Sequence, residues 1–368
     1  MKRTKRTFLL TTFLAIAVAL SLAGCRKPGD GAQVGGSSTA KFPSEIRPGL
    51  IMRYNKGGLK DSKIVYVQDV DKDAGNFTLH FLKLSDESDL YWYETRILSL
   101  ANLESGHLIH NYFNLDGGTR ETSTSALLFF GSKEMLKDLN GKGSTPFSTD
   151  FVTRGSGPAE LRRATRLRKV GTESVDIKYN GAALSVPALQ AETETALGST
   201  YPVWFHNEKA FPLIMAFSES RLAAVDDLNV VAAKIGRELE TKSALLTGSL
   251  FFGVYNLSGS ATRHEFMEVS KDIWVKGIQP VVQKSGKKCI VEVFTVQPDA
   301  KGGSPSVTQG SRRELAQVVK NLEAFLVRTS GLPKDKLVVK AAVSTEGLPA
   351  DLSPIGRDPE IRIFVHLE

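Results

Sequence analysis

The sequence lacks the motifs that mark the common catalytic centres. It contains no Gly-x-Ser-x-Gly elbow, no Walker loop and no dinucleotide-binding fingerprint. The segment Ser285-Gly286-Lys287-Lys288 fits the Ser-x-x-Lys pattern of penicillin-recognising enzymes, but no Ser-Asp-Asn or Lys-Thr-Gly partner accompanies it. We therefore predict an ordinary turn at this segment, no catalytic residues, and a protein that is not an enzyme.

Metal-binding patterns are incomplete. His107 and His110 are three residues apart, but no third ligand is evident near them. The acidic stretch at residues 69–73 imitates the start of an EF-hand calcium loop, yet Ala74 and His80 stand where that loop needs a glycine and a bidentate glutamate. These departures predict an Asp/Gly turn, with no metal and no cofactor.

Cysteine is scarce, because Cys25 and Cys289 are the two examples in 368 residues. Cys289 lies in an apolar strand pattern, which indicates a small buried hydrophobic residue rather than a nucleophile. No second apolar run approaches the length of a membrane span. The contents of 41% hydrophobic and 24% charged residues are typical of a globular protein, and the length suits two domains.

The net charge of +7 is a weak indication of partners, because four of the positive charges lie in the first six residues. Without those four the balance is near +3, from 7 minus 4. A basic cluster remains at Arg162, Arg163, Arg166, Arg168 and Lys169. No aromatic residues for base stacking lie nearby, so we predict a solvated face and no nucleic-acid partner, with anionic lipid or an acidic polymer as the alternative.

The N-terminal residues combine a basic leader, an apolar run and a small-residue cleavage pattern. Four basic residues precede the apolar run at residues 8–20, and Leu22-Ala23-Gly24-Cys25 follows it. This pattern resembles the lipobox of bacterial lipoproteins. The resemblance implies a signal peptide over residues 1–24 and a membrane partner, through lipid on Cys25. Lipidation would leave Cys289 without a disulfide partner.

Residues 25–44 are rich in Gly, Ser and Pro and contain few apolar side chains. Such a segment cannot bury enough surface to fold, so we predict a flexible tether. Position 26 holds Arg26 rather than the aspartate that retains Gram-negative lipoproteins in the inner membrane. The resemblance therefore implies a lipid-anchored protein of the outer membrane that faces the periplasm.

Residues 45–222 show the signals of an antiparallel, β-rich domain. Alternating apolar residues predict one hairpin around residues 64–84 and another around Asn180-Gly181, a pair that suits a type I′ turn. A third hairpin is predicted over residues 201–217. The Trp-bearing and Pro-Leu strands of these hairpins resemble the curved sheets of periplasmic lipoprotein carriers, which implies architecture only.

Residues 226–368 show alternating helical and strand patterns that predict a second domain with a mixed sheet covered by helices. Helical spacing begins at Asp226 or Asp227, and the chain then follows the order strand, helix, strand, helix, strand, strand. The helices are predicted at residues 226–240, 266–282 and 311–330, and the strands at residues 250–255, 289–296, 337–343 and 361–367. The whole chain is thus predicted to be an α+β protein.

Several landmarks in this second region resemble the OmpA-like domain that binds peptidoglycan. They follow one another in the family's order: Tyr255 with Gly259-Ser260-Ala261, Asp299-Ala300-Lys301-Gly302, Gly331-Leu332-Pro333, and Glu346-Gly347-Leu348-Pro349. The resemblance covers somewhat over a third of the chain, from about Val230 to Glu368. It implies an OmpA-like sandwich of helices on a mixed sheet.

The family binds the diaminopimelate branch of peptidoglycan, which presents an ammonium and a carboxylate. The resemblance implies that Asp299 meets the ammonium and that an arginine meets the carboxylate. Ungapped counting puts Glu314 at the arginine position, and Arg313 is the neighbouring candidate. Ser311 and Glu314 also fit a capping box, which accounts for the glutamate structurally. The Asn-Arg-Arg of the family is replaced here by Asp358-Pro359-Glu360.

The sequence therefore supports two hypotheses about function. In the first, the protein is an envelope tether or structural binding protein, whose OmpA-like domain contacts peptidoglycan non-covalently or, if that ligand has been lost, another envelope protein. In the second, the β-rich domain carries lipid or another apolar ligand.

Overall fold

The computed structural model of the chain describes two large sheets, one two-stranded sheet and several helices. Contacts divide the chain into a first unit, Met1–Lys41, and a second compact unit, Phe42–Glu368. The predicted α+β class is confirmed, because a large antiparallel sheet precedes a small mixed sheet with helices. The described residues are 41–57, 59–84, 91–109, 127–149, 163–198, 200–246, 266, 268–297, 306–308, 312–342 and 360–368.

The first sheet has ten strands in the order β4-β3-β2-β1-β12-β11-β10-β9-β8-β6. Adjacent strands in this order are antiparallel. One additional, parallel pairing joins the end of β8 to β12. The sheet therefore curls, so that the C-terminal end of β8 pairs with β12, although three strands lie between them in the sheet order. The strands are β1 (Leu50–Lys56), β2 (Leu59–Asp71), β3 (Asn76–Leu84), β4 (Tyr91–Ser99), β6 (Ser144–Pro146), β8 (Ala164–Tyr179), β9 (Ala182–Thr195), β10 (Thr200–His206), β11 (Ile214–Phe217) and β12 (Ser220–Asp227).

The three predicted hairpins are confirmed as β2–β3, β8–β9 and β10–β11. Asn180 and Gly181 have φ values of 50° and 84°, which the type I′ turn between β8 and β9 requires at both central residues. Asn180 also accepts a hydrogen bond at its side-chain oxygen from the Asp227 amide, at 2.7 Å. The turn therefore fixes the hairpin register and attaches its tip to the end of β12.

Two short helices and a small parallel pair of strands interrupt the β-rich region, and the sequence patterns did not predict these helices. They are α1 (Leu100–Ser105), β5 (Leu108–Ile109), α2 (Lys133–Gly141) and β7 (Ser148–Thr149). Ser99 caps α1 by accepting from the Ala101 amide at 3.2 Å, and Ser132 caps α2 by accepting from the Met135 amide at 3.1 Å. A serine before each segment was therefore the feature of the sequence that could have indicated the start of these two helices.

One face of β1–β4 and the strands β8–β12 enclose the first hydrophobic core. Leu50, Met52, Val65 and Val67 point into it from alternate positions of β1 and β2. Aromatic side chains fill its interior, and each of the following is at most 2% exposed: Tyr54, Phe77, Phe81, Phe129, Phe130, Phe205, Phe211 and Phe217.

The opposite face of β1–β3 belongs to a second core. Ile51, Ile64 and Tyr66 are at most 1% exposed and share a hydrophobic cluster with residues of the C-terminal helices and sheet. The Tyr66 hydroxyl also donates a hydrogen bond to the Asp272 carboxylate, and burial together with this bond raises the pKa of Tyr66. These three strands therefore bury both of their faces.

The second sheet is mixed, as predicted. Its order is β13-β17-β14-β15, with β16 pairing in parallel with β14. Its strands are β13 (Ala244–Leu246), β14 (Cys289–Gln297), β15 (Ser306–Thr308), β16 (Leu337–Ala341) and β17 (Glu360–Leu367). The predicted strand at residues 250–255 lies outside the described residues.

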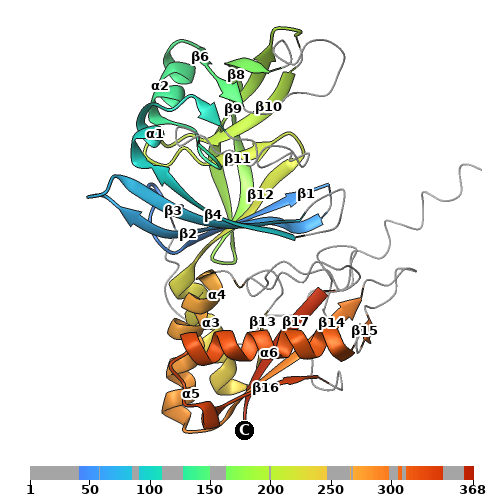
Figure 1. Cartoon of the computed structure of the whole chain (residues 1–368). Helices are drawn as coiled ribbons and strands as arrows, with labels where there is room; N and C mark the ends of the chain where they lie inside the picture. The colour runs from blue at the N-terminus through green and yellow to red at the C-terminus, as the bar shows by residue number, and fades with distance from the viewer. Residues whose placement is uncertain are drawn as a thin grey trace, which may run out of the picture. The chain divides into compact units, whose positions relative to one another are not determined.

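Helices pack on one face of the second sheet, and Figure 1 shows α6 crossing its strands. Asp227 caps α3 by accepting from the Asn229 amide at 2.9 Å, and Leu315, Val318, Leu322 and Leu326 of α6 are buried as their spacing predicted. The helices are α3 (Leu228–Thr241), α4 (Glu268–Ile273), the π-helix η3 (Trp274–Ile278), α5 (Gln279–Ser285), α6 (Arg312–Thr329) and the 3-10 turn η4 (Lys334–Lys336).

The π-helical turn η3 lies directly against α3. A Cβ atom on Gly277 would lie 2.6 Å from the Ala232 carbonyl oxygen, and one on Gly236 would lie 3.0 Å from the Gly277 oxygen. Glycine at position 277 therefore allows the two backbones to approach more closely than any other residue would. The predicted helix at residues 266–282 is confirmed in outline, but the π-turn within it was not predicted.

Candidate functional site

The candidate site is the end of the second sheet where β14 stops and α6 starts. β15 pairs antiparallel with the last three residues of β14, with Gln297 opposite Ser306 and Thr295 opposite Thr308. The helix α6 begins at Arg312, four residues after Thr308, the last residue of β15. The ladder therefore holds the strand that precedes α6 beside the last residues of β14.

Of the site residues predicted from the sequence, the structure describes the backbone of Arg313. Arg313 is the second residue of α6, so its backbone lies in the first helical turn, where a helix dipole favours an anion. Asp299 follows Gln297, the last residue of β14, by two positions and lies outside the described residues. Cys25 and Ser311 also lie outside the described residues, so lipidation and the capping box stay predictions.

Two acidic residues share this end of the molecule with Arg313. Glu314 is the third residue of α6, and Glu360 begins β17 directly opposite Val296 near the end of β14. The sequence therefore places residues of both charge signs at backbone positions near this end of the sheet.

The face of the second sheet opposite the described helices carries a strip of polar contacts. The Lys340 ammonium lies 3.1 Å from Glu292 Oε1, and His366 Nε2 lies 3.6 Å from Glu292 Oε2. Beside the strip, Phe294, Ala342 and Phe364 form a small third cluster of buried residues. The Lys340 ammonium compensates the Glu292 carboxylate, which favours a structural role for this strip.

Cys289 is not a nucleophile in this fold. It is fully buried on β14, and burial raises the pKa of its thiol to about 12, so the reactive thiolate is not formed at neutral pH. This agrees with the interpretation of Cys289 as a buried apolar residue.

The Ser-x-x-Lys segment forms the end of α5. The Ser285 hydroxyl donates to the Val282 carbonyl at 3.0 Å and accepts from the Lys287 amide at 3.2 Å, while Gly286 adopts a left-handed φ of 66°. All of these contacts belong to a helix C-terminus, as the turn prediction required.

The predicted Asp/Gly turn is confirmed between β2 and β3. Asp71 accepts from the Ala74 amide at 2.8 Å, and Gly75 has a φ of 67°. Among the residues that the structure describes, no group of three or more His, Cys, Asp or Glu side chains is arranged to hold a metal ion.

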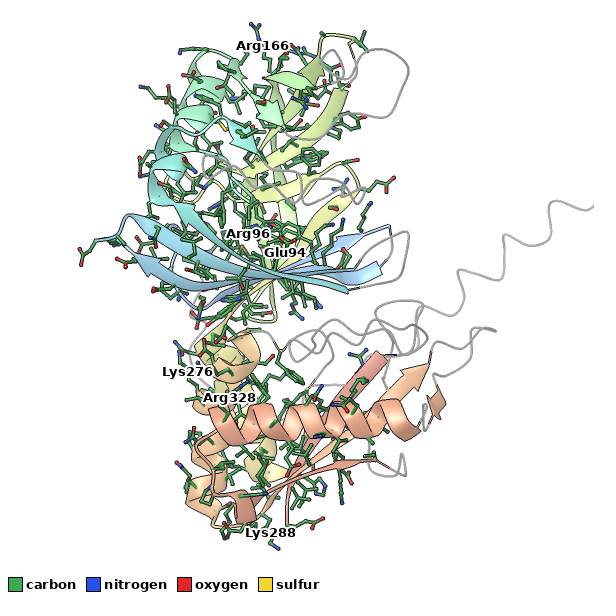
Figure 2. All side chains as sticks on the ribbon, in the orientation of Figure 1. Glu94, Arg96, Arg166, Lys276, Lys288 and Arg328 are labelled. Carbon is green, nitrogen blue, oxygen red and sulfur yellow. The ribbon has the colours of Figure 1, made fainter. Side chains whose placement is uncertain are left out.

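Carboxylates neutralise part of the basic cluster on β8. Arg168 lies 3.4 Å from Glu192 and 3.0 Å from Glu194, both on β9, and the Lys169 ammonium donates to the Asn140 side chain at 3.1 Å. Figure 2 shows Arg166 projecting from the same strand near its pairing with β6. This compensation favours the solvated-face interpretation of the cluster.

The open edge of the first sheet is β4, which pairs with β3 alone among the described strands. Glu94 and Arg96 form an ion pair of 2.6 Å on this strand (Figure 2). Both occupy the alternate positions that include the buried Leu98, so the charges lie on the inward side of the edge. Inward-pointing charges of this kind oppose pairing with a further strand.

Sequence reasoning missed two buried polar groups on β2 and β3. Lys63 is 1% exposed and donates to the Ser220 hydroxyl at 2.9 Å, while His80 is 4% exposed and contacts Gln68 and Thr95. Lysine is rarely buried, so composition carried no signal for Lys63. The continuous apolar run from Ile64 to Val67 was the sequence feature that could have indicated burial of both faces of β2.

Within the described part of the chain, no helix has the length and apolar character that crossing a membrane requires. Comparison of the chain with protein-family models, with curated proteins and with solved structures found no match.

Proposed function

We propose that this protein is an outer-membrane lipoprotein that connects the membrane, through lipid on Cys25, to peptidoglycan at the end of its C-terminal sheet. The observation that carries the proposal is the connectivity of the second region. The described chain runs from β13 through the helices α4 to α5 into β14, then through β15 and α6 into β16 and β17, and it forms a mixed sheet with helices on one face. Apart from the short strand β15, this is the order of strands and helices that the resemblance to the OmpA-like domain implies.

The chemistry of the proposed contact rests on opposite charges. Arg313, in the first turn of α6, offers a guanidinium to a carboxylate, and the dipole of an 18-residue helix adds to this attraction. Asp299 offers a carboxylate to the ammonium of the same peptide branch. Glu314 and Glu360 oppose the ligand carboxylate, so we expect weaker binding than a site with arginines at those places would give.

The carrier hypothesis has less support. The side of the first sheet that would hold an apolar ligand is filled by the protein's own aromatic residues, among them Phe129, Phe205 and Phe211, which are at most 1% exposed. An apolar ligand would have to displace this close-packed interior, at a large cost in free energy.

Sedimentation with purified peptidoglycan sacculi tests the proposal. A full-length chain carrying Cys25→Ser, which cannot be lipidated, should co-sediment with sacculi, and either Asp299→Ala or Arg313→Ala should reduce the bound fraction. Matched controls are Asp335→Ala in η4 and Arg328→Ala at the opposite end of α6 (Figure 2), which should leave binding unchanged.

Absence of the parent chain from the sacculus pellet would overturn the peptidoglycan proposal. The remaining candidate would then be contact with another envelope protein. Equal losses from Arg313→Ala and Arg328→Ala would show that binding depends on the overall charge of α6 rather than on the proposed site.

A further inference from the structure

The contact between α4 and the first sheet contains a group of titratable side chains. Tyr66 projects from β2 and donates its hydroxyl to Asp272 on α4. Glu268 lies one helical turn before Asp272, so both carboxylates lie on the same side of α4. Lys271 of the same helix forms an ion pair with Glu268 at 3.6 Å.

His80 lies next to this contact, directly opposite Tyr66 in the β2–β3 ladder. The two ring centroids are 6.3 Å apart, and the imidazole is held by the Gln68 side-chain oxygen at Nε2 and by the Thr95 hydroxyl at Nδ1, the latter at 2.9 Å. The side chain is 4% exposed. The described elements around it therefore fix the ring and exclude water.

Two opposing effects act on the charge of this imidazole. Burial lowers the pKa of His80 and outweighs the nearby carboxylates of Glu268 and Asp272, which raise it. Among the described residues, titratable groups near His80 include these two carboxylates, from α4, and the Tyr66 hydroxyl, from β2. With α4 in place, burial therefore favours the neutral form of the ring.

We propose that His80 makes the contact between α4 and the first sheet sensitive to acid, so that protonation of its imidazole favours release of the helix. When α4 leaves the sheet, the imidazole meets water and regains its ordinary affinity for protons. Because the released state binds the proton more strongly than the docked state does, a fall in pH shifts the equilibrium towards release. The proposal is independent of peptidoglycan binding.

Hydrogen exchange measured by mass spectrometry tests the proposal on the full-length Cys25→Ser chain. Exchange rates at pH 7.5 and 5.5 would be corrected for the intrinsic pH dependence of amide exchange. The opening equilibrium of α4 should rise by up to about tenfold at pH 5.5, because an imidazole with a pKa of about 6.5 is mostly protonated there. The hairpin β8–β9, which lies outside this contact, should not share the increase.

Two histidine variants separate His80 from general acid effects. His80→Gln keeps a hydrogen-bonding side chain without an ionisable ring, and it should abolish the increase at α4. His206→Gln changes the other buried histidine with a lowered pKa, in the first core, and should retain it. Equal protection of α4 at both pH values, or an unchanged increase in His80→Gln, would overturn the proposal.

A titration of the wild-type imidazoles by NMR keeps the proposal testable if His80→Gln does not fold. In the docked state, the His80 imidazole should titrate at a lower pH than an ordinary histidine does. A measured His80 pKa of about 6.5 or higher would overturn the proposal, since the docked state would then bind the proton as well as the released state does.

Discussion

Strands β1–β3 and the hairpin β8–β9 belong to one sheet but have different surroundings. From Ile64 to Val67 every side chain on β2 is at most 1% exposed, because one face meets the first core and the other meets the helices of the second. On β8, by contrast, Leu167 is buried while Arg166 and Arg168 on either side of it are exposed.

This difference shows how a strand that packs against two hydrophobic cores can be recognised in the sequence. A continuous apolar run indicates burial of both faces, whereas alternation of apolar and polar residues indicates a half-exposed strand. The run from Ile64 to Val67 therefore marks the face on which the C-terminal helices pack. The four predictions below test this comparison, from the largest expected effect to the smallest.

Ile64→Ala and Ile97→Ala compare the same change at a covered and an uncovered position of the sheet's outer face. Ile64 is fully buried beneath the second core, and Ile97 on β4 is 66% exposed. Urea denaturation should show a loss of about 2–5 kcal/mol for Ile64→Ala. Ile97→Ala should cost less than about 1 kcal/mol, which is the range of strand propensity. Equal losses would contradict the packing of β2 against the helices.

Gly277→Ala tests the close approach of η3 and α3. The new Cβ would lie 2.6 Å from a backbone oxygen of Ala232, so one of the helices must shift. We expect a loss of about 1–3 kcal/mol in the free energy of unfolding. The control is Gly141→Ala at the end of α2, where nothing lies within 4 Å and a gain or a change of less than about 1 kcal/mol is expected.

Protonation of His206 should lower the free energy of unfolding in acid. This side chain is 7% exposed, and burial lowers its pKa despite a hydrogen bond with the Phe211 carbonyl. Above a pH of about 6.5 the ring is neutral in the folded and the unfolded state, so His206 does not reduce the free energy of unfolding there. As the pH falls below that value, the unfolded state binds the proton first, and the free energy of unfolding decreases.

Urea denaturation of the wild type and of His206→Gln at pH 7.5 and 5.5 measures this contribution. The variant should lose less stability than the wild type between the two pH values. A steeper loss in the variant would reverse the sign expected from burial of His206.

Chemical labelling of the Cys289 thiol should measure how well β14 is buried in the folded protein. In the Cys25→Ser chain at pH 8, its thiol should not react with a disulfide reagent until urea unfolds the protein, because burial raises its pKa to about 12 and leaves the residue 0% exposed. Rapid labelling of the folded protein would show that β14 is accessible to solvent.

Local patterns in the sequence predicted much of the fold. Turn residues such as Asn180-Gly181, the helical stripe from Leu315 to Leu326 and the cap at Asp227 depend on neighbours within a few residues, so each was readable from the chain. Short elements were missed. α1 has six residues and little periodicity, and the π-turn η3 differs from an α-helix by a hydrogen-bond shift that composition does not record.

The candidate site was predicted in part. Motif order named Asp299, and ungapped counting put Glu314 at the arginine position with Arg313 as the neighbouring candidate; the backbone of Arg313 lies in the first turn of α6, and Asp299 lies outside the described residues. The acid-sensitive contact at His80 was not predicted. Its members come from β2, β3, β4 and α4, and no local pattern connects them.

The sequence by itself determined which segments become strands, turns and helices, because backbone preference and the spacing of apolar residues are properties of short stretches. Only the tertiary structure decided that β1–β3 serve two cores and that Tyr66 meets Asp272, 206 residues away along the chain. Such pairings depend on how whole elements pack, and packing favours the combination of faces that buries the most apolar surface with its polar groups satisfied.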